Sequence, residues 1–172
     1  MGTNSQSQLD SDITIYSDYY SNVTTKTVQS IKEISDFIES SSFDLFHIFV
    51  DIDKEGNIYD SSQNKMPIST IANLMQESSA KYIVFAKDNQ ADGYIKGSEG
   101  LNQKANIVMT ISRKGINFSD FFKKVFSKVS KGQSFPVTWN EIAPQVPNRS
   151  HDDSPETMAV MGAGNVVLLA DK

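Results

Sequence analysis

The chain contains 172 residues, of which 38% are hydrophobic and 22% are charged, and its formal net charge is −5. These values predict a soluble globular domain that is long enough to bury a core. The acidic balance argues against nucleic-acid and anionic-membrane partners, and the absence of cysteine excludes disulfides, thiolate metal sites and cysteine nucleophiles. Because no apolar segment reaches the roughly 20 residues needed to cross a bilayer, we expect a cytoplasmic location.

The first forty residues predict a tail, a strand and a helix. Residues 1–12 are polar and are expected to form a disordered tail, which leaves residues 13–172 as a single domain. Residues 13–16 alternate in strand fashion. From residue 24 to residue 40, apolar side chains recur at helical spacing, so this range is predicted to be a helix.

Buried strands alternate with helices through the rest of the chain. Short apolar runs predict strands at residues 45–50, 82–86 and 107–111. Helical spacing predicts helices at residues 69–79 and 118–129 and a short helix at 136–142. The remaining segments are predicted to be a hairpin arm at residues 57–59, a long polar loop at 87–104 and a terminal strand pair at 158–161 and 166–170. This order predicts a three-layer α/β sandwich with a mainly parallel central sheet.

Acidic residues follow the first of the buried strands. The segment Asp51-Ile52-Asp53-Lys54-Glu55-Gly56 alternates acids before a glycine, as in a calcium loop, where carboxylates gather around a hard cation. The twelfth position of an EF-hand loop requires a glutamate and is Ser62 here, so an EF-hand is not expected. Two alternatives stay open: a looser Ca²⁺ or Mg²⁺ site at Asp51, Asp53 and Glu55, or a solvated acidic hairpin that binds no ion.

The same segment also resembles the haloacid-dehalogenase phosphatase family. That family places an aspartate pair after a buried strand, and Asp51 and Asp53 match the pair. The later motifs of that family would fall at Thr110 or Ser112 and at Asp152-Asp153. The Gly-Thr that should follow the second aspartate is replaced by Lys54-Glu55, and no apolar strand precedes the late acids. The resemblance to this family is therefore incomplete.

A third pattern resembles caspase-like proteases, and bacterial CHAT domains in particular, over most of the chain. Members of that family carry a Tyr-Asp-hydrophobic-hydrophobic-His strand that ends in a catalytic His-Gly, then a hairpin, a helix and a strand that ends in the catalytic cysteine. The segments that match in type and order are Phe43-Asp44-Leu45-Phe46-His47, Met66-Pro67-Ile68-Ser69, residues 82–86, Lys131-Gly132-Gln133-Ser134 and Ser154-Pro155-Glu156-Thr157. The resemblance implies a caspase-like form of the α/β sandwich.

This resemblance fails at the catalytic positions. The histidine position falls on Asp51, and the cysteine position falls on Asp88, or on Lys87 if the register shifts by one residue. In peptide cleavage a thiolate attacks and an imidazole transfers its proton, which two carboxylates cannot do. The resemblance therefore implies an inactive pseudoprotease without a cofactor, acting as a protein-binding or regulatory subunit in a bacterial defence or stress pathway.

The expected partner is a protein that contacts the former catalytic cleft. That cleft would be lined by Asp51, Asp53, Asp88, Asn89 and the loop of residues 90–104. The competing hypothesis is a metal-dependent enzyme or sensor, in which Asp51, Asp53 and Asp88 meet around Ca²⁺ or Mg²⁺ at the ends of neighbouring strands. An ion pair between Asp51 and Lys87 or Lys54 would favour the inactive cleft, and carboxylates gathered around an ion would favour the metal site.

Overall fold

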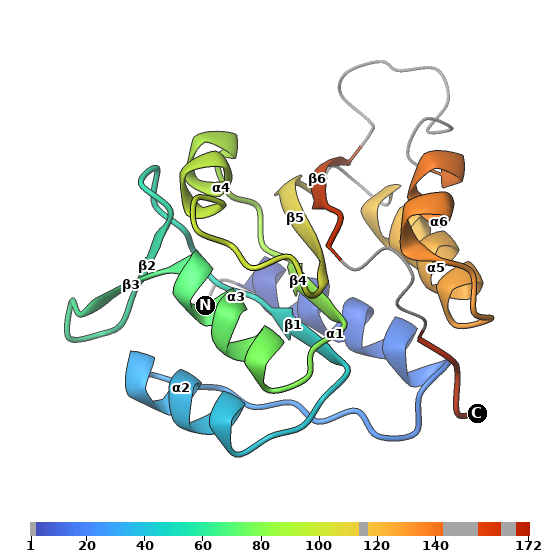
Figure 1. Cartoon of the computed structure of the whole chain (residues 1–172), viewed down its shortest axis with the longest axis horizontal. Coiled ribbons are helices and arrows are strands. Elements are labelled where there is room, and N and C mark those ends of the chain that lie inside the picture. Colours follow the sequence, from blue (N-terminus) through green and yellow to red (C-terminus); the bar gives the residue numbers. More distant parts are fainter. Residues whose placement is uncertain (1–2, 114–116, 143–154, 163–167) are drawn as a thin grey trace. The chain divides into compact units, whose positions relative to one another are not determined.

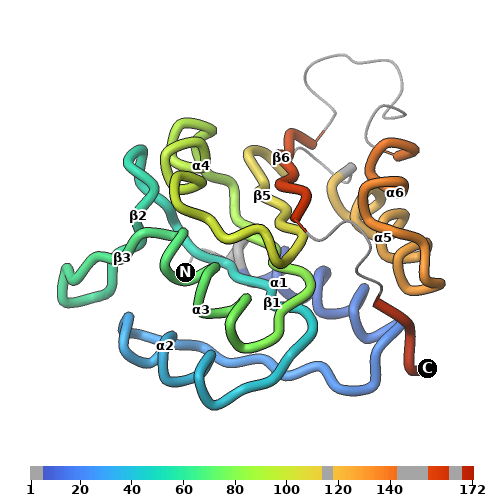
Figure 2. Tube along the Cα trace, in the orientation of Figure 1, coloured from blue at the N-terminus to red at the C-terminus, as the bar shows by residue number. Residues whose placement is uncertain are grey.

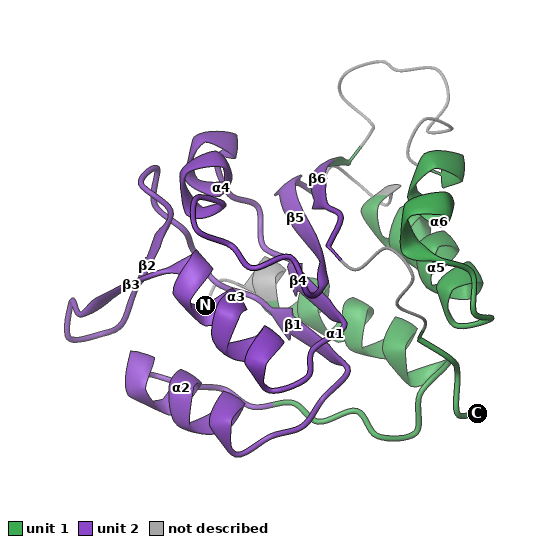
Figure 3. Cartoon of the chain, in the orientation of Figure 1, with its two compact units in different colours: residues 1–25, 113–156, 164–172 green, residues 26–112, 157–163 purple. Residues whose placement is uncertain are grey.

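The structure is a computed structural model that describes residues 3–113, 117–142, 155–162 and 168–172. Its elements in chain order are α1 (Thr3–Ser17), α2 (Ile31–Glu39), β1 (Leu45–Ile48), β2 (Asn57–Tyr59), β3 (Lys65–Pro67), α3 (Ile68–Glu77), β4 (Tyr82–Phe85), α4 (Ala91–Gly97), β5 (Asn106–Ser112), α5 (Asn117–Val129), α6 (Phe135–Ile142) and β6 (Glu156–Val160) (Figure 1). The chain divides into two compact units, the first made of residues 1–25, 113–156 and 164–172 and the second of residues 26–112 and 157–163 (Figure 3).

The second unit is built on a four-stranded sheet in the order β1-β4-β5-β6. Both β1 and β5 pair with β4 in parallel, and Figure 2 traces the course of the chain through this unit. All four residues of β4 are buried, which is expected of a strand that is covered on both faces. The prediction of a mixed α/β fold with a mainly parallel central sheet is confirmed, and the three predicted strands correspond to β1, β4 and β5.

Helix α2 begins later than the sequence predicted. The predicted range was 24–40, but the helix covers Ile31–Glu39. Its start is fixed by Ser30, whose side chain accepts a hydrogen bond from the backbone of Glu33, while the Glu33 carboxylate accepts one from the backbone of Gln29. These reciprocal contacts resemble a capping box. The β-branched residues before Ser30 are poor helix formers, because their side chains lose rotamer freedom in a helix.

Helix α4 was not predicted, because residues 87–104 were expected to form a loop throughout. Two glycines inside α4, Gly93 and Gly97, reduce helix propensity but allow close packing. A Cβ atom at Gly93 would overlap the carbonyl of Asp53, and one at Gly97 would overlap the side chain of Ile68. Tertiary contact therefore compensates for the weak local preference of this helix.

The first unit corrects the prediction for the N-terminus. Residues 3–17 form α1, where a disordered tail over 1–12 and a strand over 13–16 were expected. One face of α1 is held by an aromatic cluster, in which the Tyr16 ring meets Phe122 and Phe126 of α5 edge-to-face at centroid distances of 5.5 and 5.1 Å. Burial raises the pKa of Tyr16 well above its usual value, so its hydroxyl stays neutral. The predicted helices at 118–129 and 136–142 correspond to α5 and α6.

The C-terminal prediction is confirmed only for its first strand. β6 covers Glu156–Val160, close to the predicted range 158–161. The second predicted strand, 166–170, lies partly outside the described residues, and its described part forms an isolated antiparallel bridge from Leu169 to Lys131 instead of pairing with β6. No helix within the described ranges is long and apolar enough to cross a membrane.

Candidate functional site

The candidate site lies where β1 and β4 end, side by side, at the carboxyl edge of the sheet. The two strands stay joined past their last residues, because the Ala86 amide donates to the Ile48 carbonyl at 2.8 Å. The polar segments 50–53 and 87–89 follow directly. Ligand sites of parallel α/β sheets are built from such strand ends, and the sequence prediction that Asp51 and Asp88 follow neighbouring parallel strands is confirmed.

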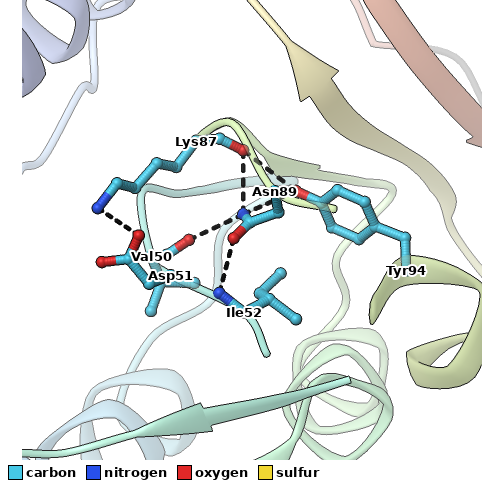
Figure 4. Close-up of polar contacts among 6 residues, drawn as sticks. All are labelled: Val50, Asp51, Ile52, Lys87, Asn89 and Tyr94. Atoms are coloured by element: carbon cyan, nitrogen blue, oxygen red, sulfur yellow. Dashed lines mark hydrogen bonds and ion pairs between the residues drawn. The ribbon is translucent and has the colours of Figure 1, made fainter. Parts of the chain in front are cut away.

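Asn89 fastens the two strand ends together (Figure 4). Its side-chain oxygen accepts a hydrogen bond from the Ile52 amide at 2.7 Å, and its side-chain nitrogen donates to the carbonyls of Val50 and Lys87, each at 3.0 Å. The side chain is buried, with 9% of its surface exposed. We expected Asn89 to line a binding surface, but its amide is used within the protein.

Tyr94, on α4, completes this network. Its ring is fully buried, and its hydroxyl receives a hydrogen bond from the Asn89 side chain at 3.1 Å and donates to the Lys87 carbonyl at 3.2 Å. Burial raises the pKa of Tyr94 far above its usual value, so the hydroxyl remains a protonated donor. The loops after β1 and β4 are thus connected to each other and to α4 through polar contacts.

Asp51 forms an ion pair with Lys87 across the two strand ends, with 2.5 Å between the Lys87 Nζ and Asp51 Oδ1 atoms. The Asp51 side chain is 81% exposed and the Lys87 side chain 28%. Because exposed pairs are screened by water and cost side-chain entropy, this pair adds little to stability. It does set the chemistry of the edge, since the Lys87 ammonium group is paired with the Asp51 carboxylate.

The second aspartate of the pair, Asp53, organises a tight turn. Its Oδ1 atom accepts hydrogen bonds from the backbone amides of Glu55 and Asn57 at 2.9 and 2.8 Å, and its Oδ2 atom accepts one from the Tyr59 hydroxyl at 2.9 Å. Gly56 adopts the left-handed conformation within this turn, with φ of 80°. The carboxylate oxygens are therefore committed to the protein's own donors.

A second turn of the same kind follows β2. Asp60 accepts backbone hydrogen bonds from Ser62 and Asn64, both at 2.9 Å, and Gln63 takes the left-handed position, with φ of 63°. In both turns an aspartate is followed by two residues, a left-handed residue and an asparagine. Asp53 and Asp60 thus shape the turns before and after β2. The acidic pattern that resembles a calcium loop in the sequence has a structural role here.

Asp53 is expected to make stability pH-dependent. Burial works to raise the pKa of Asp53, but hydrogen bonds from Asn57, Tyr59 and Glu55 outweigh it and leave the pKa lowered. A carboxyl whose folded pKa is below its unfolded pKa contributes stability that is present above the unfolded pKa, near 4, and lost as the pH falls through the folded pKa. Between about pH 5 and pH 2, urea unfolding should therefore show a steeper loss of stability for the wild type than for Asp53→Asn. Parallel curves for the two proteins would contradict this role.

Three glycines hold the Asp53 turn against α4. A Cβ atom at Gly56 would lie 2.5 Å from the backbone nitrogen of Gly97 and 2.9 Å from the carbonyl of Gly93. No larger residue fits at this contact, because both neighbours are backbone atoms. The position of the turn next to α4 is therefore fixed by packing.

Gly56→Ala and Gly100→Ala form a matched pair that tests this contact. Both glycines have similar positive φ values, +80° and +82°, but a Cβ atom at Gly100 meets nothing within 4 Å. Both variants pay the backbone strain of a left-handed alanine, about 1 kcal/mol, and only Gly56→Ala adds overpacking of about 1–3 kcal/mol. Denaturant unfolding should show that excess. Equal losses for both variants would mean that the turn can move away from α4.

The remaining predicted residues are not brought together into a second constellation. Asp88 and Glu55 are exposed, and His47 lies within β1, opposite Val84 of β4. Across residues 3–113, 117–142, 155–162 and 168–172, no three His, Asp or Glu side chains are grouped so that they could hold a metal ion. The phosphatase-type residues Thr110 and Ser112 lie in β5, whereas Asp152 and Asp153 fall outside the described residues.

Sequence reasoning missed the contacts that hold this edge in place. Asn89 and Tyr94 are joined by a hydrogen bond, but nothing in the sequence links either of them to Val50 or Ile52. The one signal in the sequence was a large aromatic residue, Tyr94, within a mostly polar segment, since a tyrosine is buried more often than its polar neighbours are. No protein-family model matches the chain, and no curated protein matches it.

Proposed function

We propose that this protein is a catalytically inactive, caspase-like pseudoprotease that works as a protein-binding or regulatory subunit. The partner would contact the carboxyl edge of the sheet, at Asp51, Asp53 and Asp88. The observation that carries the proposal is the ion pair between Asp51 and Lys87, because Asp51 takes the position where the resemblance requires a histidine. Lys87 takes the cysteine position if the register shifts by one residue from Asp88. The proposed setting in bacterial defence or stress rests on the resemblance alone.

The chemistry of this edge supports binding better than peptide cleavage. The chain has no cysteine, so no thiolate can attack, and Asp51 is paired with a cation instead of facing a hydroxyl nucleophile. The Asn89 network and the Asp53 turn make the edge rigid while Asp51 and Asp88 stay exposed. A rigid, charged and solvent-facing edge is suited to recognition, because little conformational entropy is lost on binding.

Affinity capture with charge-reversal variants tests the proposal. Asp88→Arg should reduce recovery of a co-purifying protein by tenfold or more, on the order of the 1.4 kcal/mol that a tenfold change represents. Asp18→Arg is the matched control, because Asp18 is also an exposed carboxylate near a lysine, Lys123 at 4.0 Å, but lies in the other compact unit. Equal recovery with both variants would count against this edge as the binding surface.

Calorimetric titration tests the metal-dependent alternative. We expect no heat of binding with Ca²⁺ or Mg²⁺ at millimolar concentration, because the Asp53 carboxylate is occupied by internal donors and Asp51 by Lys87. Hard cations need several free oxygens at once. Binding that is abolished in Asp53→Asn would overturn the pseudoprotease proposal in favour of a metal site.

A further inference from the structure

One buried hydroxyl group, that of Tyr94, links helix α4 to the lysine of the ion pair at the sheet edge. The Tyr94 ring is fully buried, and its hydroxyl donates to the Lys87 carbonyl at 3.2 Å (Figure 4). The same carbonyl accepts a hydrogen bond from the Asn89 side chain at 3.0 Å. The Lys87 peptide is therefore held from two sides, by α4 through Tyr94 and by the strand ends through Asn89.

The aspartate of the ion pair is held by the same network. The peptide groups before and after Asp51 bond to the Asn89 side chain at 3.0 and 2.7 Å. The Asn89 side chain in turn donates to the Tyr94 hydroxyl at 3.1 Å. The backbone on both sides of the Asp51–Lys87 ion pair is thus fixed by groups that meet at the Tyr94 hydroxyl.

The Asn89 amide cannot fix this geometry by itself. Its side-chain nitrogen carries two N–H donors, but it reaches three acceptors within 3.1 Å, namely the Val50 carbonyl, the Lys87 carbonyl and the Tyr94 hydroxyl. One N–H is therefore shared between two acceptors, as in a three-centre hydrogen bond. Because the Tyr94 hydroxyl supplies an O–H of its own, the Lys87 carbonyl still has a full donor.

The hydrogen bond from Tyr94 does not depend on pH in the neutral range. Burial raises the pKa of Tyr94, and the negative charge of the Asp88 carboxylate raises it further. The hydroxyl therefore stays protonated and remains a donor to the Lys87 carbonyl. Asp88 itself is exposed, so Tyr94 lies beneath the charged edge and within reach of its electric field.

We infer that Tyr94 is the positioning residue of the Asp51–Lys87 ion pair, through which α4 controls the edge of the sheet. This control bears on partner binding only through the proposed function, on which that part of the inference rests. Without the hydroxyl, the Lys87 peptide keeps only its shared bond to Asn89 and can move away from α4. Because the Lys87 side chain reaches Asp51 from that peptide, such a movement loosens the ion pair.

Tyr94→Phe tests the inference, because it removes the hydroxyl and keeps the buried ring. Tyr82→Phe is the matched control, since Tyr82 is also buried and its pKa is also raised by burial, to about 12. Tyr82 begins β4, at the end of the strand that is opposite Lys87. Both variants lose one buried hydroxyl, so a merely structural role would lower the stability of both and would not single out the ion pair.

The lysine ammonium signals in proton–nitrogen NMR spectra report on the ion pairs directly. Lys87 and Lys81 each pair with an aspartate, at opposite ends of the β1–β4 strand pair, and Lys87→Met and Lys81→Met assign the two signals. Tyr94→Phe should weaken the Lys87 signal about threefold, as expected for residues coupled through one hydrogen-bond network, and should leave the Lys81 signal unchanged. An unchanged Lys87 signal in Tyr94→Phe, or an equal loss in Tyr82→Phe, would overturn the inference.

Affinity capture separates this inference from the proposed function. Tyr94→Phe should reduce recovery of the co-purifying protein about threefold, through the same coupling, and Tyr82→Phe should leave it unchanged. If Asp88→Arg does not affect recovery, the proposed function fails, and the Lys87 signal still decides the role of Tyr94. If Asp88→Arg reduces recovery while Tyr94→Phe changes neither recovery nor the Lys87 signal, the proposed function stands and Tyr94 has no positioning role.

Discussion

Replacing Asp12 by asparagine is expected to lower the free energy of unfolding by about 4 kcal/mol, the middle of the range for breaking a buried ion pair. The two terminal nitrogens of Arg113 donate to the two carboxylate oxygens of Asp12, both at 2.8 Å. The side chains of Arg113 and Asp12 are only 3% and 0% exposed. The variant leaves the guanidinium buried opposite a neutral amide, so the cost of removing it from water is no longer offset.

The Arg113 guanidinium also lies over the Phe118 ring of α5, with 4.0 Å between its carbon and the ring centroid. Arg113 therefore links α1, through Asp12, with the start of α5. Urea unfolding followed by circular dichroism would measure the loss. In the variant, the buried face of α1 no longer has its ion pair with Arg113. We therefore expect α1 to unfold together with the rest of the first unit, as a loss of helical signal.

Two further variants separate this pair from ordinary surface charge. Asp18→Asn removes an exposed carboxylate that lies 4.0 Å from Lys123 and should change stability by less than about 0.5 kcal/mol. The double variant Asp12→Leu with Arg113→Met removes both buried charges and should recover most of the loss, because apolar residues of similar volume often replace a buried pair without cost. If Asp12→Asn is as stable as the wild type, α1 does not depend on this ion pair.

Asn89→Ala should lower the free energy of unfolding by about 3 kcal/mol, at about 1–3 kcal/mol for each buried group left without a partner. The Ile52 amide and the Val50 carbonyl both lose their bonds to the Asn89 side chain. Within the network drawn in Figure 4, neither group has another hydrogen-bond partner. The strand ends should then separate, which would also loosen the edge proposed to bind a partner.

Gln90→Ala is the control for Asn89→Ala. Gln90 is the exposed neighbour, and its side chain makes no capping hydrogen bond to α4. Its replacement should stay within about 0.5 kcal/mol of the wild type. Amide hydrogen exchange provides a local readout, since Ile52 should lose protection in Asn89→Ala and keep it in Gln90→Ala. Retained protection at Ile52 in both variants would mean that another acceptor holds the strand ends.

The elements that the sequence predicted are those with a strong local pattern. Apolar runs of strand length at 45–50, 82–86 and 107–111 became β1, β4 and β5. Phenylalanines at helical spacing became α5. These patterns suffice because a fully buried strand or an amphipathic helix shows its burial in its own residues.

The elements that the sequence did not predict depend on distant partners. Residues 3–17 carry few apolar side chains, and the burial of Asp12 against Arg113, 101 positions away, has no signature near either residue. α4 contains glycines that disfavour a helix locally and that make sense only beside the Asp53 turn.

The candidate site likewise has features that the sequence indicates locally and features that depend on distant partners. The sequence by itself determined that Asp51 and Asp88 each follow an apolar run of strand length, and that no cysteine chemistry is possible at those positions. Only the tertiary structure decided that Asp51 pairs with Lys87, that Asp53 serves its own turn, and that Asn89 joins the strand ends. The physical reason is that a carboxylate or an amide can serve a metal, a catalytic step or a backbone equally well, and its role is settled by which donors the fold brings within hydrogen-bond distance.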